Sequence, residues 1–208
     1  MQEFKPEELI SSFSDTELVV VALISFIDEI RKCLAAMNAF ELIEEKRISV
    51  PQVQDSLWEI NIESVWRRLI SDVAKLFDKA STCGKTNCSL KQLRQLCLLP
   101  ENAELFPNAE EDSLIGEINQ LQTLYEKAVS MSTRNQQVAH HDLEFLKSGT
   151  PSFIKLSELN NLIDETTDII SKVASKILLF DVVFPPLEDM EKMFEKAIKS
   201  MTGAQENG

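Results

Sequence analysis

Ser14–Glu45, with the sequence SDTELVVVALISFIDEIRKCLAAMNAFELIEE, predicts a long α-helix. It begins with Ser14-Asp-Thr-Glu17, a capping box in which the serine caps the helix start while the glutamate reaches back to the serine amide. Apolar residues then recur at spacings of three and four as far as Leu42, the pattern of one buried helix face. The most apolar part, Leu18–Ile27, is shorter than the roughly 20 residues that a membrane span needs, so we predict a buried helix and no membrane association.

The same helical pattern continues along the rest of the chain. Amphipathic helices are expected at 53–80, 89–98, 113–131 and 157–178, the last capped by Ser157, with a tail helix from Pro185-Pro186 to about Met201. Trp58 and Trp66 lie in the second of these helices. As large aromatic residues at helical spacing, they are expected to pack in the core, and stacking on a nucleic-acid base is the alternative role for either.

Two connections separate these helices. Ser81–Cys88 predicts a loop, and the acidic Glu101–Asp112, which contains Pro107, predicts an exposed irregular segment. The 208 residues suffice for one good core, and 44% hydrophobic residues with only 5 Gly favour a helical protein. We therefore predict an all-α fold, an antiparallel bundle of four or more helices in a single domain, residues 1–208. Its core is expected at about 14–180, with a C-terminal helix and tail at 181–208.

The cysteines and the start of the chain bear on the compartment. Cys83 and Cys88 are the only near pair among the four cysteines, and neither histidine lies close to them in the chain, so no zinc site is expected. No basic and apolar leader follows Met1. We expect reduced thiols and a cytoplasmic protein.

Both histidines of the chain lie in Met131–Asp142, MSTRNQQVAHHD, where His140 and His141 follow Arg134. Histidine both donates and accepts a proton near neutral pH, because its pKa is about 6.5. The planar guanidinium of arginine matches phosphate oxygens. Together these two side chains form a minimal site for cleaving a phosphodiester.

The spacing of these residues resembles the signature of the HEPN superfamily, in which Arg and a polar residue precede His after a short run. Arg134-Asn135-Gln-Gln-Val-Ala-His140 fits this form. The upstream stretches VWRRLISDVAKLFD, ending at Asp78, and Ser89-Leu-Lys-Gln-Leu-Arg94 are similar to the AbiU-type abortive-infection branch of that superfamily. The resemblance covers roughly Ser56 to Leu179.

The resemblance implies a metal-independent endoribonuclease that needs no cofactor and acts as a toxin in phage defence or a toxin–antitoxin system. Arg134, Asn135 and His140 would be its catalytic residues. His141, Asp142 and Asp78 are candidate supporting residues. The resemblance further implies RNA as the substrate, a homodimer that pairs two motifs, and a protein antitoxin as partner. Asp142 stands where some toxin members carry the tyrosine that their antitoxin modifies, so this route of regulation is not expected here.

Two other readings of the same residues stay open. The net charge of −13 opposes binding of a polyanion, which favours a non-catalytic helical dimer that binds a protein or a nucleotide. In the third reading, Arg134 and Asp142 form a surface ion pair and the histidines only end a helix. Residues six apart on a regular helix point about 120° from each other, so Arg134 and His140 converge only if the helix is interrupted or a second subunit completes the site.

Overall fold

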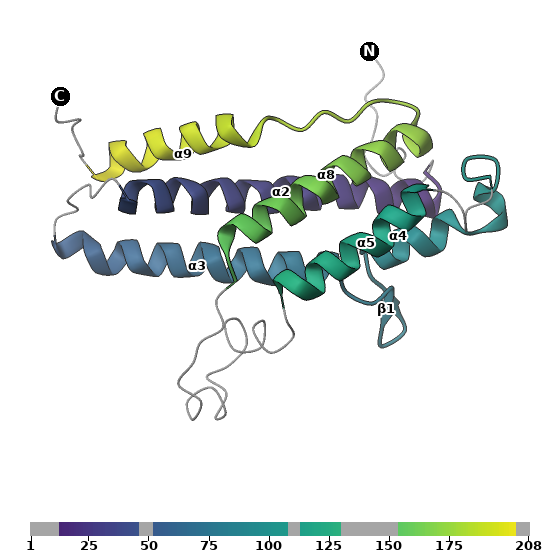
Figure 1. The fold of residues 1–208 in the computed structure, drawn as a ribbon, viewed down its shortest axis with the longest axis horizontal. Coiled ribbons are helices and arrows are strands. Elements are labelled where there is room, and N and C mark those ends of the chain that lie inside the picture. Colours follow the sequence, from purple (N-terminus) through teal and green to yellow (C-terminus); the bar gives the residue numbers. More distant parts are fainter. Residues whose placement is uncertain (1–12, 46–51, 108–112, 130–153, 203–208) are drawn as a thin grey trace, which may run out of the picture. The chain divides into compact units, whose positions relative to one another are not determined.

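The computed structural model describes residues 13–45, 52–107, 113–129 and 154–202, with the side chains of 43–45, 52–59 and 201–202 left out (Figure 1). Six α-helices lie in these ranges, together with one two-stranded sheet and a short 3-10 helix. The helices are α2 (Asp15–Glu45), α3 (Gln52–Leu76), α4 (Leu90–Cys97), α5 (Ser113–Ala128), α8 (Leu156–Leu178) and α9 (Leu187–Thr202). The protein is all-α, as the sequence predicts.

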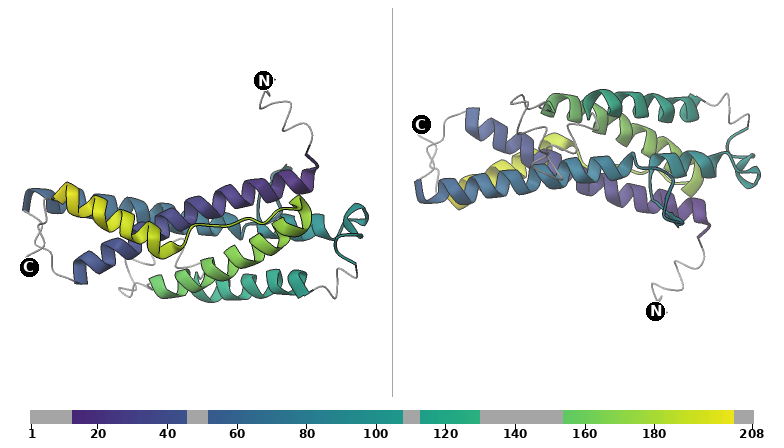
Figure 2. Two further views of the ribbon diagram at one scale, coloured as in Figure 1. Left: turned by 90° about the horizontal axis from the view of Figure 1, so that it is seen from above. Right: turned by 90° about the horizontal axis from the view of Figure 1, so that it is seen from below.

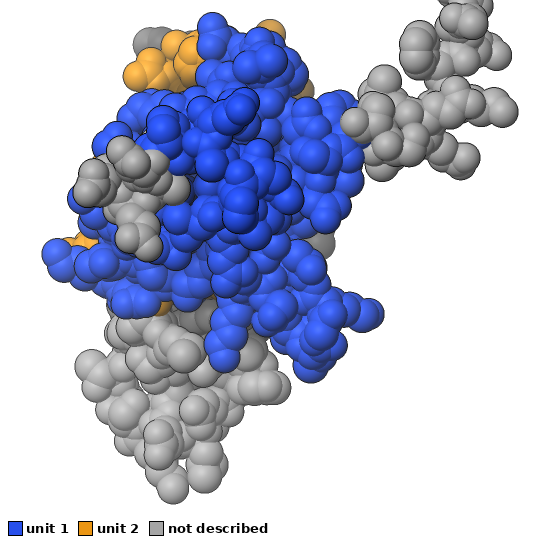
Figure 3. Space-filling model, turned by 90° about the vertical axis from the view of Figure 1, so that its right-hand side faces the viewer, with its two compact units in different colours: residues 1–27, 75–127, 162–183 blue, residues 28–74, 128–161, 184–208 orange. Residues whose placement is uncertain are grey.

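The chain forms two compact units, each built from three stretches of sequence (Figure 3). Unit 1 consists of residues 1–27, 75–127 and 162–183, and unit 2 of residues 28–74, 128–161 and 184–208. The divisions fall inside α2, α3 and α8, so each of these helices contributes residues to both units. The single domain expected from the sequence stays a prediction.

Unit 1 contains the start of α2, α4, α5 and most of α8. The capping box at Ser14 is present: the Ser14 amide donates to Glu17 Oε2 at 2.7 Å, and the Glu17 amide donates to Ser14 Oγ at 3.3 Å. The following residues Leu23 and Ile27 are fully buried. Helices α5 and α8 lie side by side and are bridged by an ion pair from Lys172 to Glu117 at 3.3 Å (Figure 2).

Unit 2 contains the end of α2, most of α3, the first turn of α8, and α9. Arg68 on α3 pairs with Glu29 on α2 at 3.1 Å, while Ile62 packs near the other end of α2, so the two helices run antiparallel. Helix α9 lies along α2 and runs in the same direction (Figure 1). Arg31 Nη2 donates to the Pro185 carbonyl at 2.7 Å, and Ile198 packs near Phe40, further along both helices.

The structure corrects several local predictions about helix ends. The second helix ends at Leu76 rather than near Ala80. The last long helix begins at Leu156, so Ser157 lies in its first turn and does not cap it. Ile60, an apolar residue of α3, is 57% exposed. Phe106, in the connection expected to be exposed, is buried beneath the Lys176 amine, which lies 5.0 Å from its ring centroid.

The predicted loop Ser81–Cys88 contains a β-hairpin. Strand β1 (Ser81–Thr82) pairs antiparallel with β2 (Lys85–Thr86), and Cys83 and Gly84 form the two-residue turn. Both turn residues have positive φ, 51° and 74°. A two-residue turn with this backbone matches the twist of the flanking strands, and glycine takes this conformation without strain.

Candidate functional site

Five of the six candidate site residues lie outside the residues that the structure describes. These are Arg134, Asn135, His140, His141 and Asp142. Their roles and their convergence therefore remain predictions. The side chain of Trp58 also lies outside the described part of the chain.

Asp78, the sixth candidate, lies directly after α3 and is half-buried. Its backbone amide donates to the Lys75 carbonyl at 3.1 Å, which closes the last turn. It lines a cavity of about 420 Å³ in unit 1, between α2, the end of α3 and the hairpin. The other lining residues are Ala22, Phe26, Lys75, Thr86, Asn87 and Cys88.

Hydrogen bonds within the protein hold the end of the hairpin that lines this cavity. Asn87 Nδ2 donates to the Lys79 carbonyl and to Thr82 Oγ1, both at 2.8 Å. The Asn87 amide donates to the Ala80 carbonyl at 2.9 Å. Both side-chain N–H donors of Asn87 are thus used inside the hairpin, so this residue contributes shape rather than donors to the cavity.

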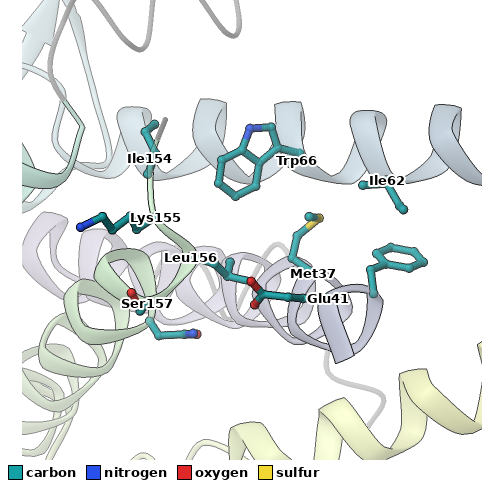
Figure 4. Close-up of a pocket in the computed structure, with 10 residues that line it drawn as sticks. Met37, Glu41, Ile62, Trp66, Ile154, Lys155, Leu156 and Ser157 are labelled. Carbon is teal, nitrogen blue, oxygen red and sulfur yellow. The ribbon is translucent and has the colours of Figure 1, made fainter. Parts of the chain in front are cut away.

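A second and larger pocket, of about 830 Å³, lies within unit 2 (Figure 4). Its apolar lining comes from α2, α3 and the start of α8, and its polar lining from α2 and the chain around the α8 start. The apolar residues are Met37, Phe40, Ile62, Trp66, Ile154 and Leu156, and the polar ones are Glu41, Lys155, Ser157 and Asn160. Figure 4 shows the Trp66 indole projecting from α3 toward Leu156 and Met37.

Hydrogen bonds that link Glu191 through Asn38 to Asn160 orient the Asn160 side chain in this pocket. Asn38 Nδ2 donates to Asn160 Oδ1 at 3.0 Å and to Glu191 Oε1 at 2.5 Å. Asn160 Nδ2 returns a hydrogen bond to Asn38 Oδ1 at 3.2 Å. An ionised carboxylate only accepts hydrogen bonds, so Glu191 selects the amide orientation of Asn38, and Asn38 selects that of Asn160.

The cysteines are candidate metal ligands by residue type. All four cysteines are thiols, Cys33 and Cys97 buried and Cys83 and Cys88 exposed. Burial raises the pKa of the Cys33 thiol, an effect that the Arg68 guanidinium partly opposes. Among the residues that the structure describes, no group of three His, Cys, Asp or Glu could hold a metal ion.

Arg67 and Arg68 are exposed on α3 and form ion pairs with carboxylates. Arg67 pairs with Glu63 on the same helix. Arg68 pairs with Glu29 and, at 3.4 Å, with Asp72. Their charges are balanced by these carboxylates, so this face of α3 offers little attraction to a phosphate chain.

Comparison with known proteins agrees with the all-helical class of the structure. The family model HEPN_AbiU2, described as AbiU2, matches residues 17–189. The chain therefore belongs to the AbiU2 family of HEPN proteins, and the predicted resemblance is confirmed. No match was found among curated proteins or among solved structures. Within the described ranges, no helix has both the length and the apolar character needed to cross a membrane.

The pocket around Trp66 was not predicted from the sequence. Trp66 was expected in the core, yet it is half-buried and lines an open pocket. Its neighbours Arg67 and Arg68 are exposed on the same helix, which signals that Trp66 lies at the edge of the buried face. Lys155 and Asn160 carry no comparable signal, because their place depends on how the start of α8 meets α2 and α3.

Proposed function

We propose that the protein is a metal-independent endoribonuclease that acts as the toxin of a phage-defence or toxin–antitoxin system. Membership of the AbiU2 family carries this proposal, because the matched residues 17–189 contain the Arg134-Asn135-x4-His140 motif. Arginine and histidine are the two groups that the chemistry needs, one for charge and one for proton transfer.

In the proposed reaction, a ribose 2′-OH attacks the adjacent phosphorus. A bond forms between the 2′-oxygen and phosphorus, and the bond from phosphorus to the 5′-oxygen breaks. The products are a 2′,3′-cyclic phosphate and a free 5′-OH, and the proton lost by the 2′-OH is restored on the 5′-oxygen. His140 shuttles this proton, Arg134 stabilises the charge that builds on the phosphate, and Asn135 binds or orients it.

Two partners belong to the proposal. The first is a second copy of the chain, since one motif offers few groups to bind a polyanion and a dimer doubles them. The second is a protein antitoxin that keeps the nuclease silent. Asp142 in place of a modifiable tyrosine means that such an antitoxin would act by binding or by another modification.

The test is RNA cleavage by purified variants with matched controls. His140→Ala should abolish cleavage, and Arg134→Lys should be severely impaired, because lysine keeps the charge but loses the planar donors. The adjacent exchange His141→Ala is the control and should be milder. The helical circular dichroism and melting temperature should stay near those of the parent. Equal cleavage by the His140 and Arg134 variants and the parent would refute the proposal.

A second candidate function is a non-catalytic dimer that binds a protein or a nucleotide. The net charge of −13 favours it, because long-range repulsion weakens binding of a long polyanion. A parent protein that cuts no RNA under any buffer condition, yet binds a partner, would select this function over the nuclease.

A further inference from the structure

The pocket in unit 2 has the chemistry of a site for a flat, polar and negatively charged ligand. One wall is the Trp66 indole, and the opposite side is formed by Met37 and Leu156 (Figure 4). An indole ring is a stacking surface for an aromatic heterocycle. The volume of about 830 Å³ falls within the range of about 300–1,000 Å³ found for sites of small ligands.

The polar groups of the pocket are arranged to orient such a ligand. Within the described part of the chain, Asn160 uses one side-chain N–H and one lone pair on Asn38, which leaves one of each for a ligand. The Glu41 carboxylate is an acceptor for an exocyclic amino group of a base. Figure 4 shows the Lys155 amine pointing away from Glu41, on the other side of the pocket as drawn. The two opposite charges therefore lie apart, and a ligand with a base at one end and a phosphate at the other satisfies both.

Lys155 is available for a phosphate. Among the residues that the structure describes, the Lys155 amine pairs with Glu158 at 3.6 Å, and the Lys155 side chain is 73% exposed. An exposed ion pair of this length contributes little to stability, so little is lost when the amine turns to a ligand.

We propose that this pocket binds one nucleotide of a single-stranded RNA, with the base stacked on Trp66 and contacting Glu41 or Asn160, and the phosphate beside Lys155. The inference rests on the proposed function, since the nucleotide belongs to the RNA that the protein cleaves. It goes further by assigning a binding subsite outside the Arg134–His140 motif, built from α2, α3 and the start of α8.

The test measures binding separately from cleavage. The His140→Ala protein is used because it should leave the RNA intact, and Trp58→Phe is added so that Trp66 is the only tryptophan. The probes are two RNA homopolymers of six nucleotides, hexaadenylate and hexauridylate. Binding is measured by fluorescence anisotropy of the RNA and by quenching of the Trp66 fluorescence. At least one hexamer should quench Trp66 with the same affinity that anisotropy gives.

Two substitutions should weaken this binding in different ways. Trp66→Leu, read by anisotropy, should weaken it about 5- to 150-fold, the value of one stacked base, whereas Trp66→Tyr should retain most of the affinity. Lys155→Gln should reduce the slope of log affinity against log salt by about 0.7, the effect of one lost contact to single-stranded phosphate.

Each substitution has a matched control elsewhere in the chain. Phe180→Leu removes an aromatic ring that is 57% exposed and outside the pocket. Lys192→Gln removes an exposed lysine that pairs at i,i+3 with Asp189 at 3.5 Å, as Lys155 does with Glu158 at 3.6 Å, although the acidic residue here precedes the lysine in the chain. Neither control should change RNA affinity or its salt dependence.

The outcomes separate this proposal from the proposed function. RNA binding that is unchanged in Trp66→Leu and Lys155→Gln overturns the pocket and leaves the nuclease intact. The absence of any hexamer binding up to millimolar concentration also overturns the pocket. A parent that cuts no RNA, while the hexamer still depends on Trp66 and Lys155, supports the pocket and refutes the nuclease.

Discussion

The two units hold pockets of different chemistry. In unit 1, Asp78 and Lys75 line a small cavity, and the donors of its neighbour Asn87 are taken up within the hairpin. In unit 2, Trp66 and Lys155 line a pocket of about twice the volume, with an aromatic ring on one side and an amine in a long, exposed ion pair. The comparison teaches that two pockets which each contain a carboxylate and a lysine differ in the other groups that line them: an asparagine held by the hairpin in unit 1, and the Trp66 indole in unit 2.

The largest expected effect concerns the cores of the two units. Leu23 in unit 1 and Leu34 in unit 2 are both fully buried on the same helix, α2. Replacing either with alanine should lower the free energy of unfolding by about 2–5 kcal/mol. If the chain is a single domain, both variants should shift one common transition in chemical denaturation.

The control for these two variants is Leu42→Ala, because Leu42 lies on the same helix and is 38% exposed. It should change the free energy of unfolding by less than about 1 kcal/mol. Two separate transitions, each shifted by only one of the buried variants, would contradict the single domain and would make the units independent.

The next effect concerns one bridging asparagine in each unit. Asn102 Nδ2 donates to the Leu96 carbonyl and Thr16 Oγ1 in unit 1, whereas Asn38 bonds Asn160 and the Glu191 carboxylate in unit 2. Asn38→Ala should cost about 1.5–3 kcal/mol and Asn102→Ala about 0.5–1.5 kcal/mol, since hydrogen bonds to charged groups are stronger.

The same two variants also bear on the pocket in unit 2. Asn38→Ala should weaken RNA hexamer binding, because Asn160 loses the partner that orients it. Asn102→Ala should bind as tightly as the parent. Equal loss of binding in both variants would show that general destabilisation, not the orientation of Asn160, is responsible.

The smallest expected effect compares two glutamates in first helical turns. Glu17 in unit 1 is hydrogen-bonded by Ser14, and the Ser14 backbone amide is the main reason that its pKa is lowered. Glu158 in unit 2 pairs with Lys155 at 3.6 Å. Glu17→Ala should cost about 0.5–1 kcal/mol at pH 7, and Glu158→Ala less than about 0.5 kcal/mol.

The pH dependence of the Glu17 effect follows from the direction of the pKa shift. The contribution of Glu17 is present above the unfolded pKa of about 4.3 and is lost as the pH falls through the lower folded pKa. Melting temperatures of the parent and Glu17→Ala should therefore differ at pH 7 and converge toward pH 3. A melting-temperature difference that stays constant between pH 7 and pH 3 would mean that the capping by Glu17 does not depend on the charge of its carboxylate.

The helices could be predicted from the sequence because local signals define their ends. Ser14 with Glu17, Ser89, and Pro185-Pro186 mark the starts of α2, α4 and α9, and all three starts are confirmed. Ser89 Oγ indeed accepts from the Gln92 amide at 3.3 Å. These signals act within one turn of chain, so no tertiary information is needed to read them.

Other features depend on contacts between distant residues and were missed. The turn of the hairpin is Cys83-Gly84 rather than the usual Asn-Gly, so the pattern gave only a loop. Phe106 is buried, and the amine of Lys176 on α8 lies 5.0 Å from its ring centroid. The pocket around Trp66 exists only because three helices meet. For the motif itself, the sequence shows the residue types and the spacing of Arg134 and His140. It does not show whether their side chains lie close together.

The most direct test of the central claim is the chemistry of RNA cleavage in the presence of EDTA. The parent should cut RNA with excess chelator and leave 2′,3′-cyclic phosphate and 5′-OH ends, because the attacking group is the 2′-OH and no metal is required. The same protein should leave DNA of the same sequence intact, since DNA lacks that hydroxyl. Cleavage that needs a divalent metal, that also cuts DNA, or that persists in His140→Ala would contradict the account.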